Sequence, residues 1–263
     1  MLASPWIAAL AALFLWWFST GAILWVVKRA DADGPDGHLW ASILSMPVLF
    51  AGVVGLKTSL DQTGPEGAYI AFLSALAVWG WIELAFLSGI VTGPNRNPCP
   101  ENADGWHRFS AAVTAILYHE GLLIFALAAI WAISFGAENQ LAFWSFAVLF
   151  FARVSAKLNL FLGVPKINTE FLPTPLAHIP SYFRIRKINW MFPISVTALT
   201  LAVACWLERL HATGDIAFSL LTALTALALL EHWLMVLPLP DEKLWRWMLP
   251  APKKTKVRNT HGL

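Results

Sequence analysis

Charged residues are scarce in this 263-residue sequence, and their scarcity limits the class of protein to which it can belong. Aspartate, glutamate, lysine and arginine make up 13% of the chain, whereas a soluble domain carries about 25%. Hydrophobic residues make up 58%, against roughly 45–50% in soluble proteins. So few charges cannot cover a water-facing surface, and the composition therefore excludes an ordinary soluble domain.

Several features that other protein classes need are also missing. The formal net charge is only +2 and the basic residues form no continuous patch, so no nucleic-acid partner is expected. Of the two cysteines, Cys99 lies in a polar segment and Cys205 in an apolar run, which favours neither a disulfide bond nor a cysteine metal site. Glycine-rich phosphate loops, Cys-x-x-Cys pairs and nucleophile elbows are absent, so no motif indicates a specific enzyme chemistry.

Long apolar runs fill most of the chain. A helix of about 20 apolar residues crosses the hydrocarbon core of a bilayer. Runs of this kind occupy residues 6–27, 39–56, 68–91, 109–135, 141–163, 190–207 and 216–237. The second run is short and contains Pro47, which a membrane helix tolerates when its neighbours satisfy the freed carbonyl. We therefore predict an all-α, polytopic membrane helical bundle with about seven transmembrane helices.

The basic residues predict the orientation of this bundle, because lysine and arginine concentrate in cytoplasmic segments. With seven spans, Lys57 and Arg209 lie on one side of the membrane, and Arg153 and Lys157 lie within the fifth span. The opposite side holds the other basic residues: Lys28, Arg29, Arg96, Arg108, Lys166, Arg184, Arg186, Lys187, Lys243, Arg246, Lys253, Lys254, Lys256 and Arg258. The N-terminus is therefore predicted to be periplasmic and the C-terminus cytoplasmic.

Three long cytoplasmic segments follow from this topology: residues 93–107, residues 165–189 and the tail from residue 241. Residues 1–240 are expected to form the bundle, including an ordered cytoplasmic loop at residues 165–189, and residues 241–263 are expected to form a basic cytoplasmic tail. Prolines forbid a long helix in the loop, while its aromatic residues suit a segment at the membrane surface. Candidate partner contacts in the loop are Asn168, Glu170, His178, Tyr182 and Arg184. The basic residues of the loop and tail also favour contact with anionic lipid.

Polar side chains inside the predicted spans are the candidate functional site, because buried ionisable groups cost several kcal/mol unless they are paired or hydrated. The set consists of Glu83, His119, Glu120, Arg153, Lys157, Asn159, Glu231 and His232. Arg153 and Lys157 are one helical turn apart and share a face. That face is predicted to point into the bundle.

Three interpretations of these residues remain open. One is a structural network in which Glu83 and Glu120 face Arg153 and Lys157, with Arg153 paired to Glu120. A second takes the carboxylates and the two histidines as ligands of an intramembrane metal. The third takes His119 or His232 as the axial ligand of the magnesium in a chlorin.

One segment resembles a known family. Residues 153–184, RVSAKLNLFLGVPKINTEFLPTPLAHIPSYFR, together with Trp-Ile-Glu at 81–83 and Tyr-His-Glu-Gly at 118–121, are similar to the PuhE family of photosynthetic complex assembly proteins of purple bacteria. The resemblance implies a multi-pass protein of the cell inner membrane or intracytoplasmic photosynthetic membrane. It would help to build the reaction centre and light-harvesting apparatus, or adjust its bacteriochlorophyll supply. The resemblance implies no catalytic residues.

The expected function is therefore an integral membrane assembly factor. Its candidate ligand is bacteriochlorophyll or a precursor, and its expected partners are photosynthetic complex subunits or pigment-handling proteins, besides the lipid bilayer. His119 is the first candidate pigment ligand. The alternative is a metal-dependent intramembrane oxidoreductase that acts on a lipid or a tetrapyrrole.

Overall fold

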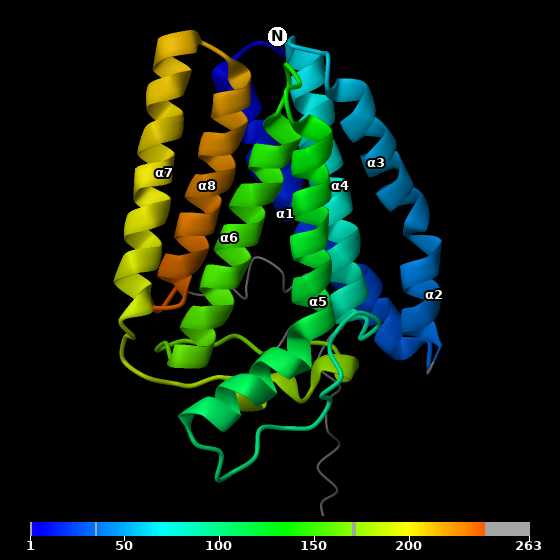
Figure 1. Ribbon diagram of the computed structural model, residues 1–263, viewed down its shortest axis with the longest axis vertical. Helices are drawn as coiled ribbons and strands as arrows, with labels where there is room; N and C mark the ends of the chain where they lie inside the picture. The colour runs from blue at the N-terminus through cyan, green and yellow to red at the C-terminus, as the bar shows by residue number, and fades with distance from the viewer. Residues whose placement is uncertain (1, 35, 170–171, 240–263) are drawn as a thin grey trace, which may run out of the picture.

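The computed structural model describes residues 2–34, 36–169 and 172–239, which form long helices packed side by side (Figure 1). Within these ranges the α-helices are α1 (Pro5–Ala32), α2 (Gly37–Leu44), α3 (Met46–Ser59), α4 (Pro65–Leu87), α5 (Gly105–Ser134), α6 (Leu141–Leu162), α7 (Met191–Thr213) and α8 (Ile216–Leu234). Two short 3-10 helices, η1 (Thr174–Leu176) and η2 (Ile179–Tyr182), lie between α6 and α7. The predicted tail, residues 241–263, lies outside the described residues.

The structure confirms the predicted fold class. With α2 and α3 taken as one span, the described part of the chain contains 7 helical segments that are long and apolar enough to cross a membrane. The same residues contain no β-strand, although an isolated bridge joins Val164 to Ile185. The protein is therefore a multi-pass helical membrane protein.

Two predicted spans differ from the observed helices for local reasons. The span predicted at residues 39–56 is broken, because α2 ends at Leu44, α3 begins at Met46, and the chain bends between them. Pro47 lies in the first turn of α3. Backbone N–H groups in a first turn have no partner within the helix, so the missing N–H group of proline costs no hydrogen bond there. The span predicted to end at Val91 is too long, because α4 stops at Leu87 and the chain continues as a loop.

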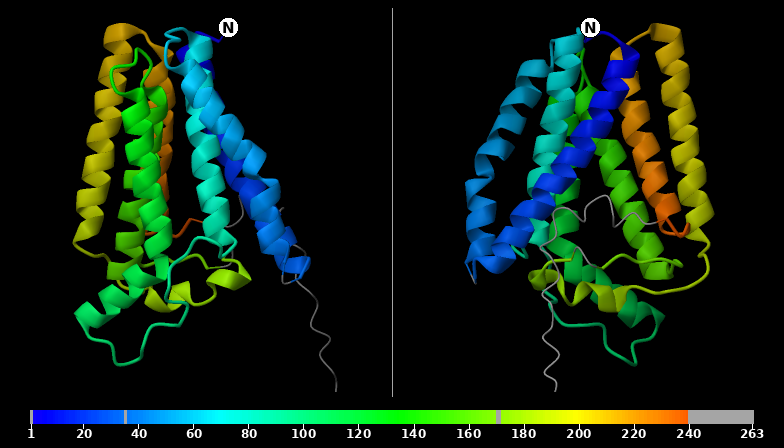
Figure 2. Two further views of the ribbon diagram at one scale, coloured as in Figure 1. Left: turned by 45° about the vertical axis from the view of Figure 1, so that its right-hand side comes forward. Right: turned by 180° about the vertical axis from the view of Figure 1, so that it is seen from behind.

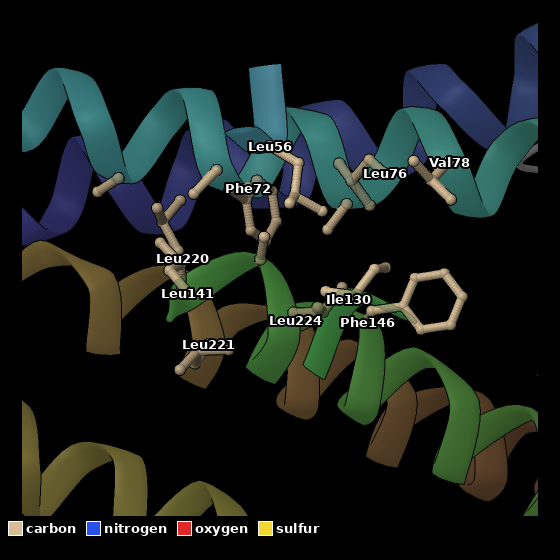
Figure 3. Packing of buried hydrophobic residues seen from close by; sticks show 14 of the residues in the cluster. Leu56, Phe72, Leu76, Val78, Ile130, Leu141, Phe146, Leu220, Leu221 and Leu224 are labelled. Carbon is tan, nitrogen blue, oxygen red and sulfur yellow. The ribbon is translucent and has the colours of Figure 1, made fainter. Parts of the chain in front are cut away.

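Helix α4 occupies the centre of the bundle (Figure 2). It contacts α1, α3, α5, α6 and α8, whereas α7 packs outside against α8 and α6. Its small residues Ala68, Ala71 and Ala75 are buried, and small side chains allow neighbouring membrane helices to approach closely. Figure 3 shows larger core residues from α4, α6 and α8, such as Phe72, meeting across this centre.

Helix α5 bends where the loop of residues 88–104 meets it (Figures 1 and 2). The carbonyl of Thr92 accepts hydrogen bonds from the backbone N–H groups of Tyr118, at 2.9 Å, and His119, at 3.1 Å. The N–H group of Asn95 donates to the carbonyl of Thr114 at 3.4 Å. The loop thus bonds to the backbone in the middle of α5, and insertions of this kind bend helices.

The loops 88–104 and 163–190 meet at one end of the bundle, which we call the loop end. There Phe86 of α4 and Ala115 of α5 form a second apolar core with three residues of the loop between α6 and α7, namely Leu176, Ile179 and Tyr182, all of them buried. This core fixes η1 and η2 against the bundle. The segment between α6 and α7 is thereby packed against the helices.

Candidate functional site: a buried ionic cluster beside a cavity

Five polar residues meet where α4, α5 and α6 approach the loop end, and we call them the ionic cluster: Glu83, His119, Glu120, Arg153 and Lys157. The guanidinium of Arg153 donates through Nη2 to Glu83 Oε2 at 2.6 Å. Lys157 Nζ donates to the carboxylate of Glu120 and lies 2.9 Å from His119 Nδ1. Each carboxylate of the ionic cluster therefore has a cation as its partner.

This pairing corrects one detail predicted from the sequence. Arg153 pairs with Glu83 and not with Glu120, which belongs to Lys157. The two cations lie one turn apart on α6, so each reaches a different neighbouring helix. The residue nearer the loop end, Lys157, reaches α5, while Arg153 reaches α4.

His119 is completely enclosed within the ionic cluster. Its exposed fraction is 0%, and its ring packs against that of Phe86 with 4.2 Å between centroids. Its Nδ1 lies 3.3 Å from Glu120 Oε1, and its Nε2 lies 3.6 Å from Glu83 Oε1. Nδ1 therefore faces Glu120 and Lys157, whereas Nε2 has no hydrogen-bond partner among the described residues, and the role of His119 as an axial ligand of a chlorin stays a prediction.

His232 and Asn159 lie in a separate polar network. His232 Nε2 is 2.9 Å from the hydroxyl of Ser155, and its Nδ1 is 2.8 Å from the carbonyl of Ala228. Asn159 donates to the hydroxyl of Ser195 at 2.9 Å, and Asn189 donates to the side-chain oxygen of Asn159 at 3.1 Å. This network holds α6 to α7 and α8, and it leaves neither nitrogen of His232 free for a metal or pigment.

Across the described residues, the carboxylates, histidines and cysteines form no group of three or more that could hold a metal ion. The donor set itself explains this, because Glu83 and Glu120 are bonded to Arg153 and Lys157, whose charges repel a cation. The described residues therefore give no support to the predicted intramembrane metal site.

Beside the ionic cluster lies a cavity of about 330 Å³, which we call the lateral cavity. It lies between α1, α4, α6 and α8 and is lined mainly by apolar side chains, with Asn168 and Leu172 of the loop also in its lining. Its charged lining residues are Glu83, Arg153 and Glu231. Glu231 accepts a hydrogen bond from the side chain of Trp16.

The lateral cavity includes residues that the sequence did not single out. Trp16, Ser19 and Thr20 of α1 line it. In the sequence, these residues of α1 are only weak indicators of a site, because serine and threonine are common in membrane helices and tryptophan favours membrane interfaces. Only the packing of α1 against α4 and α8 brings them to Glu231.

The predicted loop residues have different environments. Tyr182, expected at the surface, is instead buried with 3% exposure, and its hydroxyl donates to the carbonyl of Asn97 at 2.9 Å. Burial raises the pKa of its phenol. His178 is half-buried, and burial lowers its pKa. Arg184 is partly exposed beside Phe161, Asn168 lines the lateral cavity, and Glu170 lies outside the described residues.

Fold and site together define a polytopic helical membrane protein with a buried ionic cluster beside a mainly apolar cavity. Residues 2–256 match the family described as "Protein of unknown function (DUF3623)", and the chain belongs to this family. It is 55% identical over 252 residues to the "Uncharacterized 30.4 kDa protein in puhA 5'region" of Rhodobacter capsulatus, covering 94% of this chain and 92% of that protein. No solved structure matches the chain.

Proposed function

We propose that this protein is an integral membrane assembly factor for the photosynthetic reaction centre and light-harvesting apparatus. The observation that carries the proposal is its similarity, at 55% identity along nearly the whole chain, to a protein named for its position in the puhA 5' region. The resemblance of residues 153–184 to photosynthetic complex assembly proteins supports the same role. The proposed location is the cell inner membrane, including its intracytoplasmic photosynthetic extension.

The site favours binding over catalysis. An acid or base catalyst needs a group that can exchange a proton with substrate, but the carboxylates of Glu83 and Glu120 are held by cations. The lateral cavity instead offers fixed polar groups in an apolar wall, which is the pattern of a binding pocket. Arg153 Nε is a buried donor without a hydrogen-bond partner among the described residues.

The size of the lateral cavity limits what can enter it. Pockets for drug-sized ligands have volumes of roughly 300–1,000 Å³, and this one, at about 330 Å³, lies at the small end. A complete chlorin with its isoprenoid tail is larger than a drug-sized ligand. We therefore propose that the cavity accepts one polar edge of a pigment, while the rest of the pigment or its apoprotein lies against the outer faces of the helices.

The proposed orientation places the loop end in the cytoplasm, as the distribution of basic residues favours. Reporter fusions after Asp33 and after Lys254 should then be active on the cytoplasmic side, and fusions after Gly64 and Asn139 on the periplasmic side. Alkaline phosphatase and green fluorescent protein fusions measure the two locations. A cytoplasmic signal from the Gly64 fusion would show that the orientation is wrong.

Deleting the gene in a purple phototroph should lower or delay the near-infrared absorption of the pigment-protein complexes while bacteriochlorophyll is still synthesised. The reason is that an assembly factor acts after pigment synthesis. Membrane absorption spectra and solvent-extracted pigment, compared at equal cell density, measure the two quantities. Complete loss of bacteriochlorophyll would contradict assembly and favour an enzyme of pigment synthesis.

Complementation of the deletion strain then tests the lateral cavity. Glu231→Gln should restore membrane protein abundance but not normal spectra, because Glu231 lines the cavity and takes part in no ion pair within the described residues. Glu208→Gln, on the outer helix α7 and away from the cavity, is the matched control and should restore both. Normal spectra with Glu231→Gln would remove the cavity from the mechanism.

A further inference from the structure

Arg108 and Arg184 lie against one aromatic ring at the loop end, and Arg186 lies beside Arg184. We call the three residues the arginine cluster. The guanidinium carbon of Arg108 lies 4.7 Å from the centroid of the Phe161 ring, and that of Arg184 lies 5.9 Å from the same centroid. Phe161 is in the last turn of α6. The arginine cluster therefore lies where α6 leaves the bundle.

The backbone around Gly163 sets the positions of Arg184 and Arg186. The N–H group of Val164 donates to the carbonyl of Arg184, and the N–H group of Arg186 donates to the carbonyl of Val164, both at 3.1 Å. This pairing holds residues 184–186 extended, so the first and third side chains lie on the same face. Gly163 has φ +122°, and a Cβ there would lie 2.8–2.9 Å from the side chain of Arg186. Only glycine allows this close contact.

Within the described residues, the positive charge of the arginine cluster has no counter-charge. Among the residues that the structure describes, no carboxylate forms an ion pair with Arg108, Arg184 or Arg186. Arg108 is buried, with 6% exposure, and although its Nη2 donates to the carbonyl of Tyr182, its buried Nη1 has no partner there. Burial, followed by the charges of Arg108 and Arg186, lowers the pKa of Arg184. A buried cationic group with an unused donor is suited to bind an anion.

The surroundings place this anion at a membrane surface. Trp106 and Phe109, in the first turns of α5, have exposures of 73% and 37%, and Phe109 packs edge-on against Phe161 at 5.7 Å. Exposed tryptophan and phenylalanine beside arginine are typical of the headgroup level of a bilayer. We propose that the arginine cluster binds the phosphate of an anionic phospholipid headgroup, with the acyl chains lying along α5 and α6.

An anionic phospholipid fits the arginine cluster better than an acidic segment of a partner protein does. Planar guanidinium groups bind phosphate oxygens in pairs, and several can share one phosphate. The apolar surface next to the arginine cluster suits acyl chains. An acidic peptide would leave the exposed aromatic rings of Trp106 and Phe109 without a partner.

Native mass spectrometry of the full-length protein in detergent micelles with equal amounts of phosphatidylglycerol and phosphatidylcholine tests the proposal. The wild-type protein should retain phosphatidylglycerol in preference to phosphatidylcholine. The double variant Arg184→Gln, Arg186→Gln should lose about tenfold in this retention, because charge-assisted hydrogen bonds are removed. Arg108 is left unchanged, since its bond to Tyr182 supports the loop. Lys187→Gln removes one positive charge from the adjacent exposed residue and should behave as wild type.

Four results would overturn the proposal. Equal retention of both lipids by the wild-type protein, or unchanged retention by the double variant, would show that the arginine cluster does not select a lipid. Inorganic phosphate that raises the melting temperature of delipidated protein as much as phosphatidylglycerol does would assign the site to free phosphate. Retention of neither lipid would leave an acidic protein segment as the occupant.

Discussion

Replacing Arg153 by leucine should lower the free energy of unfolding by about 3 kcal/mol, because it leaves the carboxylate of Glu83 buried without its cation. Glu83 has only 7% exposure and lies on the central helix α4, where no other described lysine or arginine forms an ion pair with it. The Arg153–Glu83 distance of 2.6 Å indicates a direct charge-assisted hydrogen bond. Reversible unfolding in mixed micelles measures the change.

Two double variants then identify the partner of Arg153. Arg153→Leu with Glu83→Gln should recover most of the lost stability, because removing both members of a buried ion pair can be nearly neutral. Arg153→Leu with Glu120→Gln is the matched control and should be no more stable than the single variant, since Glu120 belongs to Lys157. If the Glu120 variant rescues and the Glu83 variant does not, the pairing described above is incorrect.

Replacing Gly93 by alanine should also cost about 3 kcal/mol, because the new Cβ has no space. It would lie 2.0 Å from the carbonyl oxygen of Thr114 and 2.7 Å from the carbonyl carbon of Ala115, both backbone atoms of α5. The loop must then move away from α5, and overpacking of this kind typically costs 1–3 kcal/mol before hydrogen bonds are counted. Here the bonds from Tyr118 and His119 to Thr92 would be lost as well.

Gly121→Ala provides a control on the same helix. A Cβ at Gly121 meets no heavy atom within 4 Å, so alanine should stabilise α5 by roughly 0.5–1 kcal/mol through its higher helix propensity. Thermal unfolding followed by circular dichroism compares the two variants. A Gly93→Ala protein as stable as wild type would mean that the loop does not pack against α5 as described.

The apolar runs predicted the spans because the bilayer imposes a length on each helix. The same solvent argument selected the members of the ionic cluster, since charged side chains inside the membrane need partners. It could not choose which partner belongs to which residue. That choice depends on the relative rotation of α4, α5 and α6, and no local pattern in the sequence records a rotation.

Other features depend on contacts between distant residues. The bend in α5 requires the loop residue Thr92 to reach His119. In the sequence, the local indication of this contact is Gly93, a glycine in a polar segment. Tyr182 was misplaced because an aromatic residue among prolines resembles a membrane-surface residue. In the structure its hydroxyl is bonded to residues of the other loop, which allows it to be buried.

The pairing of α1 with α8 has a consequence for biosynthesis. These helices lie side by side, and the hydroxyl of Ser219 donates to the carbonyl of Pro5 at 2.6 Å. Because membrane helices leave the ribosome in order, α1, α4 and α6 are inserted before α8 exists. Until then the wall that Glu231 and its neighbours contribute is missing, and Arg153 faces lipid through the gap. A nascent chain that stops before Ile216 would therefore expose a charged face to the bilayer, a feature by which membrane proteases could distinguish unfinished from finished copies.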